Sequence, residues 1–299
     1  MCRLLGYATA GCNLSLGAVL GGRAVDDYRN LSEIHNDGWG TALLSAPVQP
    51  ADCDDGGAPT PETDTKLYKT TLAARHDPLF DLLAGEPARG ALWHLRLASS
   101  HLPLIMENQQ PFFAHGLSFV HNGDISDDHH RNIVTNREYP VDGAVVSSTG
   151  GKSDSAVFFA VILEYVGFGF PLDRCVAQAV RQLRRTYPAS SYNCMVQSDD
   201  ELIVLRASGR ERTSPRIVDI YERYGRGAQV GDYRALRYRP ILGHGGSPIG
   251  VVAASSGFSP TRDQGWTDLR NDQLLVASTR TGPCRLQSLQ RQADARTSP

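Results

Sequence analysis

The chain opens with MCRLLG at residues 1–6, and no other segment constrains its architecture as strongly. Apolar residues from Leu4 to Tyr7 predict a buried strand over residues 2–9. If Met1 is removed, Cys2 carries a thiol and a free α-amine on one residue. An α-amine has an unperturbed pKa of roughly 7.7–8.0, which suits a general base at neutral pH, and such a base activates a thiol. The alternative is that Cys2 is only the first residue of a buried strand.

Length and composition indicate a globular protein with a sizeable core. The chain has 299 residues, of which 41% are hydrophobic and 21% charged, and its formal net charge is −2. This balance argues against nucleic acid or an anionic membrane as the partner, and no apolar run approaches the ~18 residues of a membrane span. Because the sequence contains no repeat and no Gly/Ser linker, we expect one domain over residues 1–286 and a disordered polar tail over residues 287–299.

The cysteines are scattered and favour a cytoplasmic protein with reduced thiols. None of them forms a CxxC pair, so their spacing predicts neither a zinc site nor a redox site. We therefore expect no metal and no cofactor. The six are Cys2, Cys12, Cys53, Cys175, Cys194 and Cys284.

The pattern along the chain predicts an α+β layered sandwich, because runs of strands are interrupted by paired helices. In the segment 90–97, Leu92, His94 and Arg96 share one face of the expected strand, and Trp93 lies on the other. Ser153 is a good N-cap for a helix over 153–165. Two long loops are expected at 47–65 and 126–152. Further expected elements are strands at 39–44, 117–121, 249–254 and 273–278, a helix at 173–187, and a hairpin of 193–197 with 201–207.

Three segments offer groups that a cysteine nucleophile would need. Asn122 and Gly123 form a turn that can present two N–H donors to an oxyanion, although Asn-Gly is also a common hairpin turn. Arg96 lies in a strand fit for burial and could bind a carboxylate in a bidentate manner, or form a structural ion pair. Asp154 could bind an ammonium, or simply favour the start of a helix. Together, Arg96 and Asp154 describe a site for an α-amino acid, and the amide attacked would be the γ-amide of glutamine.

At this point the chain resembles the class II (N-terminal nucleophile) glutamine amidotransferases. It is most similar to their stand-alone branch, which includes the γ-glutamyl-hercynylcysteine-sulfoxide hydrolases of ergothioneine biosynthesis. The resemblance spans nearly the whole chain, and its motifs occur in the family's order. They are MCRLLG at 1–6, DGWG at 37–40, HLR at 94–96, NQQPF at 108–112, HNG at 121–123 and SDS at 153–155.

The resemblance implies a four-layer αββα sandwich of two antiparallel sheets, with the catalytic cysteine at the start of an inner strand. It also implies that Cys2 attacks the γ-carbonyl while Asn122 Nδ2 and Gly123 N–H stabilise the oxyanion. Arg96 and Asp154 then bind the substrate, and Trp39 and Gly40 are expected to shape the pocket wall. The loops 47–65 and 126–152 are longer than the pattern requires, so substrate specificity does not carry over.

The expected substrate is a small molecule, either glutamine or a γ-glutamyl compound, and a separate ammonia-accepting synthase is a possible partner. Two other functions stay open. One is an N-terminal-cysteine acylase of the penicillin or bile-salt type, against which the Arg96 and Asp154 pair argues. The other is a non-catalytic partner subunit that keeps the fold.

Overall fold

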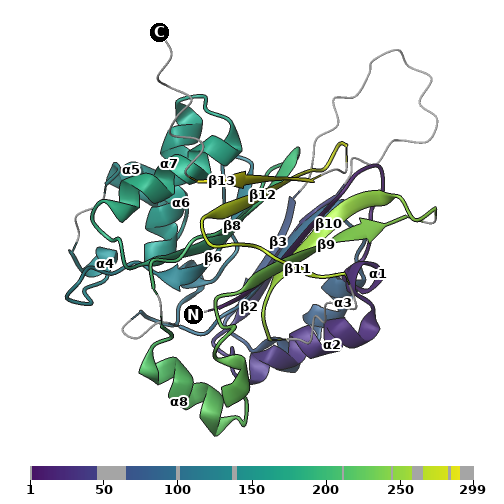
Figure 1. Cartoon of the computed structure of the whole chain (residues 1–299), viewed down its shortest axis with the longest axis horizontal. Coiled ribbons are helices and arrows are strands. Elements are labelled where there is room, and N and C mark those ends of the chain that lie inside the picture. The colour runs from purple at the N-terminus through teal and green to yellow at the C-terminus, as the bar shows by residue number, and fades with distance from the viewer. Residues whose placement is uncertain are drawn as a thin grey trace.

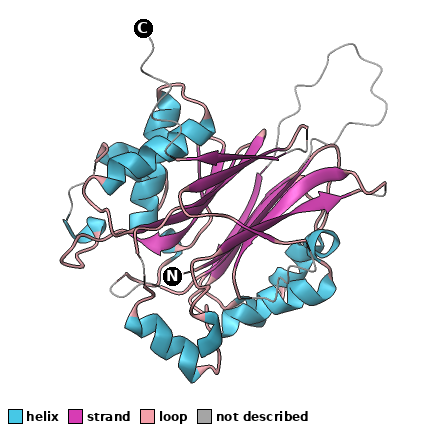
Figure 2. Ribbon diagram, viewed as in Figure 1, coloured by secondary structure: helices cyan, strands magenta, loops and turns pink. Residues whose placement is uncertain are grey.

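Two antiparallel β-sheets stack face to face between two layers of helices (Figures 1 and 2). This arrangement was obtained as a computed structural model. The structure describes residues 2–45, 65–98, 102–136, 140–210, 212–243, 245–257, 265–281 and 284–289. The expected four-layer α+β sandwich is confirmed.

The larger sheet has seven strands in the order β11-β9-β10-β1-β4-β2-β3. The strand β1 lies at its centre, paired with β10 on one side and β4 on the other. The strands are β1 (Arg3–Thr9), β2 (Trp39–Leu44), β3 (Thr65–Thr70), β4 (Gly90–Leu95), β9 (Leu236–Leu242), β10 (Pro248–Ser255) and β11 (Thr267–Asp268).

The smaller sheet has six strands in the order β13-β12-β8-β7-β6-β5. Its β7–β8 hairpin and β12 lie where the sequence predicts them. The strands are β5 (Phe112–Ala114), β6 (Leu117–Asp124), β7 (Ser191–Gln197), β8 (Glu201–Arg206), β12 (Gln273–Ser278) and β13 (Cys284–Ser288).

Helices cover the outer face of each sheet (Figure 2). The first three pack on the larger sheet, and the group from α4 to α7 packs on the smaller one, while α8 lies at one end (Figure 1). The helices are α1 (Leu16–Leu20), α2 (Gly22–Asn30), α3 (Leu79–Gly85), α4 (Ile133–Asn136), α5 (Gly143–Ser148), α6 (Asp154–Gly167), α7 (Leu172–Arg184) and α8 (Pro215–Arg223).

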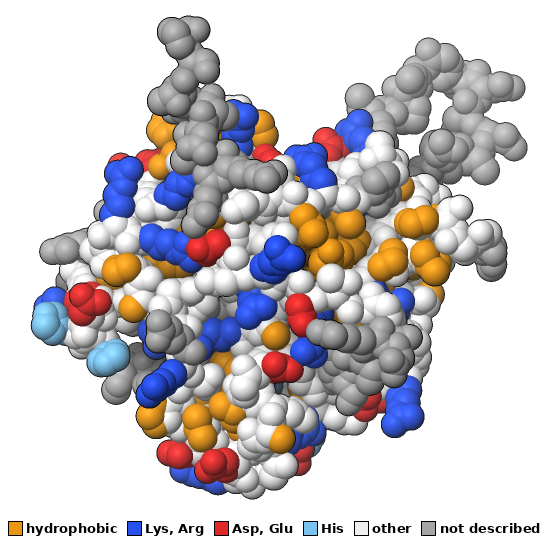
Figure 3. Space-filling view, viewed as in Figure 1, with side chains coloured by type: hydrophobic (Ala, Val, Ile, Leu, Met, Phe, Trp, Pro, Cys, Tyr) orange, Lys and Arg blue, Asp and Glu red, His pale blue; other side chains and the backbone are white. Residues whose placement is uncertain are grey.

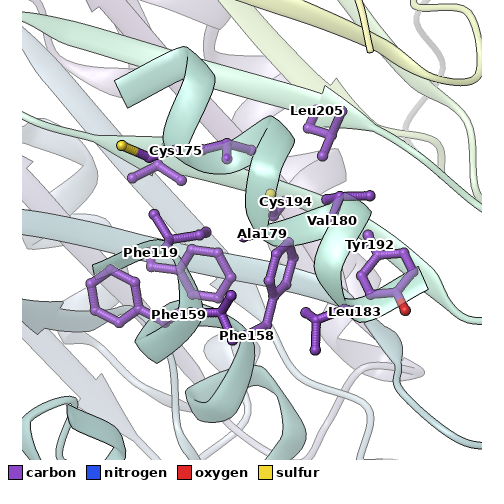
Figure 4. Close-up of a cluster of buried hydrophobic side chains, with 14 of the residues drawn as sticks. Phe119, Phe158, Phe159, Cys175, Ala179, Val180, Leu183, Tyr192, Cys194 and Leu205 are labelled. Atoms are coloured by element: carbon purple, nitrogen blue, oxygen red, sulfur yellow. The ribbon is translucent and has the colours of Figure 1, made fainter. Parts of the chain in front are cut away.

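The largest core cluster lies between the smaller sheet and its helices. Aromatic rings from β6 and α6 fill its centre, with Phe119 stacked on Phe159 at 5.0 Å and edge-on to Phe158 (Figure 4). Because every residue of α6 from Asp154 to Leu163 is buried, this helix lacks the polar face of a surface helix. Its N-terminus is therefore fixed firmly against the sheet.

Strand alternation divides the residues of β1 between two cores. Leu5 and Tyr7 pack toward the helices, whereas Leu4 and Ala8 pack against the other sheet. Since side chains alternate along a strand, residues of even number in this segment face the gap between the sheets. Cys2 shares that parity with Leu4, so the strand directs its side chain toward the gap.

Three expectations about chain organisation need correction. The segment 126–152 is not one long loop: it contains α4 and α5, and α5 begins where the Asp142 side chain accepts from Ala144 N. The strand β13 continues to Ser288, two residues beyond the expected domain boundary at 286, because its register with β12 extends to the pair Gln273 and Ser288. Asn122 and Gly123 form no turn, because they lie within β6 and pair with Asn193 and Tyr192 of β7. The expected loop at 47–65 is not tested, because it lies outside the described residues except for residue 65, which begins β3.

Candidate active site

Cys2 directly precedes β1, at the end of the larger sheet where β1 and β4 run antiparallel. In that pairing Leu4 lies opposite His94 and Arg3 opposite Leu95. Continuing the register by one residue places Cys2 opposite Arg96. The predicted face of Leu92, His94 and Arg96 is therefore the face that looks into the gap between the sheets.

Asn122 reaches the same gap from the other sheet. Val120, two residues earlier on β6, belongs to the core between the sheets, so alternation points the Asn122 side chain toward β1. The Cys2 backbone N donates to Asn122 Oδ1 at 2.8 Å. Because Oδ1 accepts this bond, Nδ2 is turned away from Cys2 N and, within the described ranges, donates no hydrogen bond. The amide is thus oriented with a free donor.

Gly123 occupies a position where no side chain fits. A Cβ added there would lie 1.9 Å from Ser191 O and 2.2 Å from His121 Nε2. The glycine therefore lets β6 pass close to β7 immediately after Asn122. Its backbone lines the same pocket as Cys2, so the two predicted oxyanion donors come from adjacent residues at one point of the site.

Arg96 is buried, with 3% of its surface exposed, and lines the pocket. Its Nη2 donates to Pro103 O at 3.3 Å, while Nη1 is buried and has no acceptor in the part of the chain that the structure describes. Burial lowers the pKa of Arg96, and the charges of Cys2, Asp37 and Asp154 oppose that shift. A guanidinium with an unused buried donor can bind an anionic group in the pocket.

Asp154 begins α6 and is also buried against the pocket. Its Oδ2 accepts from Ile125 N at 2.9 Å and from Asn132 Nδ2 at 3.2 Å, and its Oδ1 accepts from Ser155 N at 3.0 Å. Burial raises the pKa of this carboxyl, and the nearby charge of Asp124 adds to that effect. A buried carboxylate that makes no ion pair within the described ranges favours a bound cation.

The structure therefore brings together Cys2, Arg96, Gly123 and Asp154 around one pocket, with Asn122 bonded to Cys2 behind it. The free volume of the pocket is about 20 Å³, room for roughly one water molecule. Any larger ligand must widen it. The other lining residues are Leu97, Ala98, Leu102, Asn108, Gln110, His121, Ser153 and Ser155.

Several of these residues lie in the sequence motifs but were not predicted as site residues. Gln110 Oε1 accepts from His121 N at 2.6 Å, which ties the two motifs together across β6. Ser153 was predicted only as a helix cap, yet its side chain makes no cap hydrogen bond, and its buried Oγ has no partner among the described residues. The signal that could have identified Ser153 is its place in the SDS motif, directly before Asp154.

Two buried histidines flank the site and are kept neutral by burial. The Nδ1 atom of His121 lies 2.9 Å from Ser155 Oγ, and the Nε2 atom of the same ring lies 2.9 Å from Ser191 O. Burial lowers the pKa of His121. For His94, burial and then the charge of Arg96 lower the pKa to about 3. Burial therefore favours the neutral form of both rings.

Trp39 and Gly40 do not line the pocket. The Trp39 ring is fully buried on the helix-covered face of the larger sheet, where it stacks on Trp93 at 5.9 Å and donates from Nε1 to Asp77 Oδ2 at 3.0 Å. Residue parity on β2 explains this placement, because Trp39 points away from the gap between the sheets. Gly40 faces Gln110, a lining residue: an added Cβ would lie 2.3 Å from Gln110 O.

Solved structures provide a comparison for this arrangement. A glutamine aminotransferase class-II domain protein from Silicibacter pomeroyi superposes with a TM-score of 0.57 over 96% of this chain and 99% of that one, at 18% identity. The chain has the fold of class II glutamine amidotransferase domains. Glutamine phosphoribosylpyrophosphate amidotransferase from B. subtilis gives a TM-score of 0.54 at 15% identity, over 96% of this chain and 49% of that longer one.

Sequence comparison adds no further relative: no family model and no curated protein matches the chain. Within the described ranges, acidic, histidine and cysteine side chains do not gather in threes that could hold a metal ion. No helix in those ranges combines the length and apolar character needed to cross a membrane.

Proposed function

We propose that this protein is an amidohydrolase of the glutamine amidotransferase type, which cleaves the γ-amide of glutamine or of a γ-glutamyl conjugate. The observation that carries the proposal is the hydrogen bond from Cys2 N to Asn122 Oδ1. It fixes the nitrogen that becomes the α-amine after removal of Met1, and it leaves Asn122 Nδ2 available as a donor beside Gly123. In this proposal Cys2 supplies the nucleophile and the base, and Asn122 and Gly123 supply the two oxyanion donors.

The charges of the pocket match an α-amino acid head group. Arg96 Nη1 has no acceptor among the described residues and would bind the substrate α-carboxylate. Asp154 would bind the α-ammonium, and the unpartnered Ser153 Oγ is a further polar contact. A bound zwitterion would give Arg96 a counter-anion and Asp154 a counter-cation at the same time. A steroid or β-lactam acyl group would leave Asp154 unpaired, which argues against an acylase of the penicillin or bile-salt type.

The reaction follows from these positions. The Cys2 thiol gives its proton to its own α-amine, and the thiolate forms a bond to the carbonyl carbon of the γ-amide. The oxygen of the resulting tetrahedral species accepts from Asn122 Nδ2 and Gly123 N–H. The α-ammonium returns the proton to the leaving nitrogen as the C–N bond breaks, which releases ammonia or an amine. Water then attacks the γ-glutamyl thioester and the C–S bond breaks, which releases glutamate and regenerates the free thiol.

The identity of the leaving group is the finer part of the proposal. The MCRLLG start and the HNG and SDS motifs resemble the stand-alone γ-glutamyl-hercynylcysteine-sulfoxide hydrolases, which supports a γ-glutamyl conjugate as substrate. We propose that the γ-glutamyl part occupies the pocket of Arg96 and Asp154, and that the rest of the conjugate is the leaving group. A conjugate would need no ammonia-accepting synthase, whereas glutamine as substrate would leave such a partner possible.

The test is turnover of a substrate panel by the purified protein. Release of glutamate from glutamine, from simple γ-glutamyl amides and from γ-glutamyl thio-conjugates is measured with no acceptor enzyme present. We expect turnover of at least one member, and its loss in Cys2→Ala, a variant that still allows removal of Met1. Cys12→Ala is the matched control, because Cys12 is also a free thiol but lies outside the pocket. Equal turnover by Cys2→Ala and the wild type would refute the proposal.

A further inference from the structure

A second cavity, of about 460 Å³, lies between the end of β8 and the edge of the larger sheet formed by β9 and β11. This volume is typical of small-molecule sites. No residue lines both this cavity and the pocket of Cys2. The lining residues are Arg206, Ser208, Gly209, Arg210, Thr213, Gly231, Asp232, Arg234, Ala235, Arg237, Asp268 and Asn271.

Four arginines dominate this cavity, but only some of their charges are neutralised. Arg237 is paired twice, with Asp232 at 2.8 Å and with Asp268 at 2.7 Å, so the two acids of the lining are both used by one arginine. Arg210 Nη2 pairs with Asp124 at 2.5 Å, and Asp124 is not part of the lining.

The other two arginines, Arg206 and Arg234, make no ion pair within the described residues. Arg206 Nη1 donates to Leu269 O at 2.6 Å, and Arg234 Nη2 donates to Arg212 O at 2.8 Å. Each side chain is held by one hydrogen bond to a backbone carbonyl, which leaves most of its N–H donors unused. Counted with Asp124, the four arginines and three acids at this cavity leave one positive charge in excess, and Arg206 and Arg234 are the two cations that make no ion pair among the described residues. The face of the molecule in Figure 3 shows basic side chains gathered near its centre with a few acidic ones beside them.

Buried donors without acceptors add to this imbalance. Arg210 Nε and Arg234 Nε are both buried and lack a hydrogen-bond partner in the part of the chain that the structure describes. Burial, together with the adjacent charge of Arg210, lowers the pKa of Arg234. Crowding two guanidinium groups while leaving buried N–H groups unpaired is unfavourable unless an anion binds between them.

We propose that this cavity binds the phosphate group of a small molecule, at a site separate from the catalytic pocket. A phosphate is the better match than a single carboxylate, because it has more acceptor oxygens and can contact both Arg206 and Arg234. Its oxygens accept several N–H bonds at once, and arginine forks fit that geometry. The source of the phosphate group is either inorganic phosphate or a phosphate ester, and the cavity has room for an ester.

Calorimetric titration of the full chain with two probes, inorganic phosphate and glycerol phosphate, tests this proposal. We expect one binding event per chain, weakened about tenfold or more in Arg234→Gln, because hydrogen bonds to charged groups are strong. Arg206→Gln provides an independent variant should Arg234→Gln fail to fold, and Arg234→Lys should retain part of the affinity. Arg174→Gln, an exposed arginine on α7, is the matched control and should bind as the wild type does.

The outcomes are distinct. Equal affinity for both probes would identify free phosphate as the ligand, and tighter binding of glycerol phosphate would identify an ester; both support the shared chemistry. Glycerol alone should not bind. The proposal is overturned if the wild type binds neither probe, or if both arginine variants fold and bind with unchanged affinity. Because binding is measured without turnover, failure here is independent of the amidohydrolase proposal.

Discussion

Replacing Arg96 with methionine separates the role of this arginine in binding from its role in the fold. In the structure Arg96 is 3% exposed and makes one side-chain hydrogen bond, to Pro103 O at 3.3 Å. Its Nη1 has no partner among the described residues. The backbone bonds of Arg96, to Gly38 O and from Asp37 N, do not depend on the side chain. Methionine has an unbranched apolar side chain that can fill the space of the arginine stem.

The substitution should affect the free energy of unfolding and kcat/KM differently, in both sign and size. A single long hydrogen bond contributes at most about 1.5 kcal/mol, while removing a buried charge also removes its desolvation penalty, which is several kcal/mol per ion. The free energy of unfolding should therefore stay within about 1 kcal/mol of the wild type or rise. Losing two charge-assisted bonds to a substrate carboxylate, at about 1.5 kcal/mol each, should cost about 3 kcal/mol. That loss corresponds to more than about 100-fold in kcat/KM.

Urea unfolding and steady-state kinetics on the best substrate of the panel measure the two effects. The account predicts an Arg96→Met protein that is at least as stable as the wild type, with kcat/KM reduced mainly through KM. A variant destabilised by several kcal/mol with an unchanged KM would show that Arg96 is a structural residue, and the assignment of the carboxylate site would be wrong.

Three further predictions concern single groups near the site. Because burial raises the pKa of Asp154, KM for the substrate should increase on acidification at a higher pH than for an ordinary carboxyl; a KM independent of pH would contradict this. Gly123→Ala should destabilise the protein by about 1–3 kcal/mol or more in urea, since its Cβ would lie 1.9 Å from Ser191 O, whereas Gly143→Ala, with open space around it, should not. His94 has a folded pKa of about 3, below its unfolded value of roughly 6.5. The unfolded state therefore binds the extra proton as pH falls through this interval, and the wild type should lose stability there by up to about 1.4 kcal/mol per pH unit relative to His94→Gln. Parallel stability curves for the two proteins would count against that burial effect.

The sequence predicted the strands and main helices of the site because their patterns are local. The alternation in residues 90–97 correctly separated Arg96 from Trp93, and Ser153 correctly located the start of α6. The prediction that Cys2, Asn122 and Asp154 belong to one site, in contrast, depended on the resemblance to a family. No periodicity in one sequence shows which strands of two sheets face each other.

Other features depend on contacts that sequence patterns do not reveal. Trp39 was expected at the pocket wall, but a turn motif does not show which face of the following strand each residue occupies. The helices α4 and α5 were missed because their segment is polar and rich in turn residues, and α8 was missed although Pro215 at its first turn is a helix-start signal. The cavity of Arg206 and Arg234 combines segments far apart in the chain.

The mass of the mature protein before and after reaction tests the central claim most directly. The protein is purified from its host, its intact mass is measured, and it is then treated with a diazoketone analogue of glutamine and digested. The account predicts a chain that begins at Cys2 and gains one adduct, on the N-terminal peptide, with parallel loss of turnover. A chain that retains Met1 and turns over substrate at full rate, or an adduct on another peptide, would contradict it.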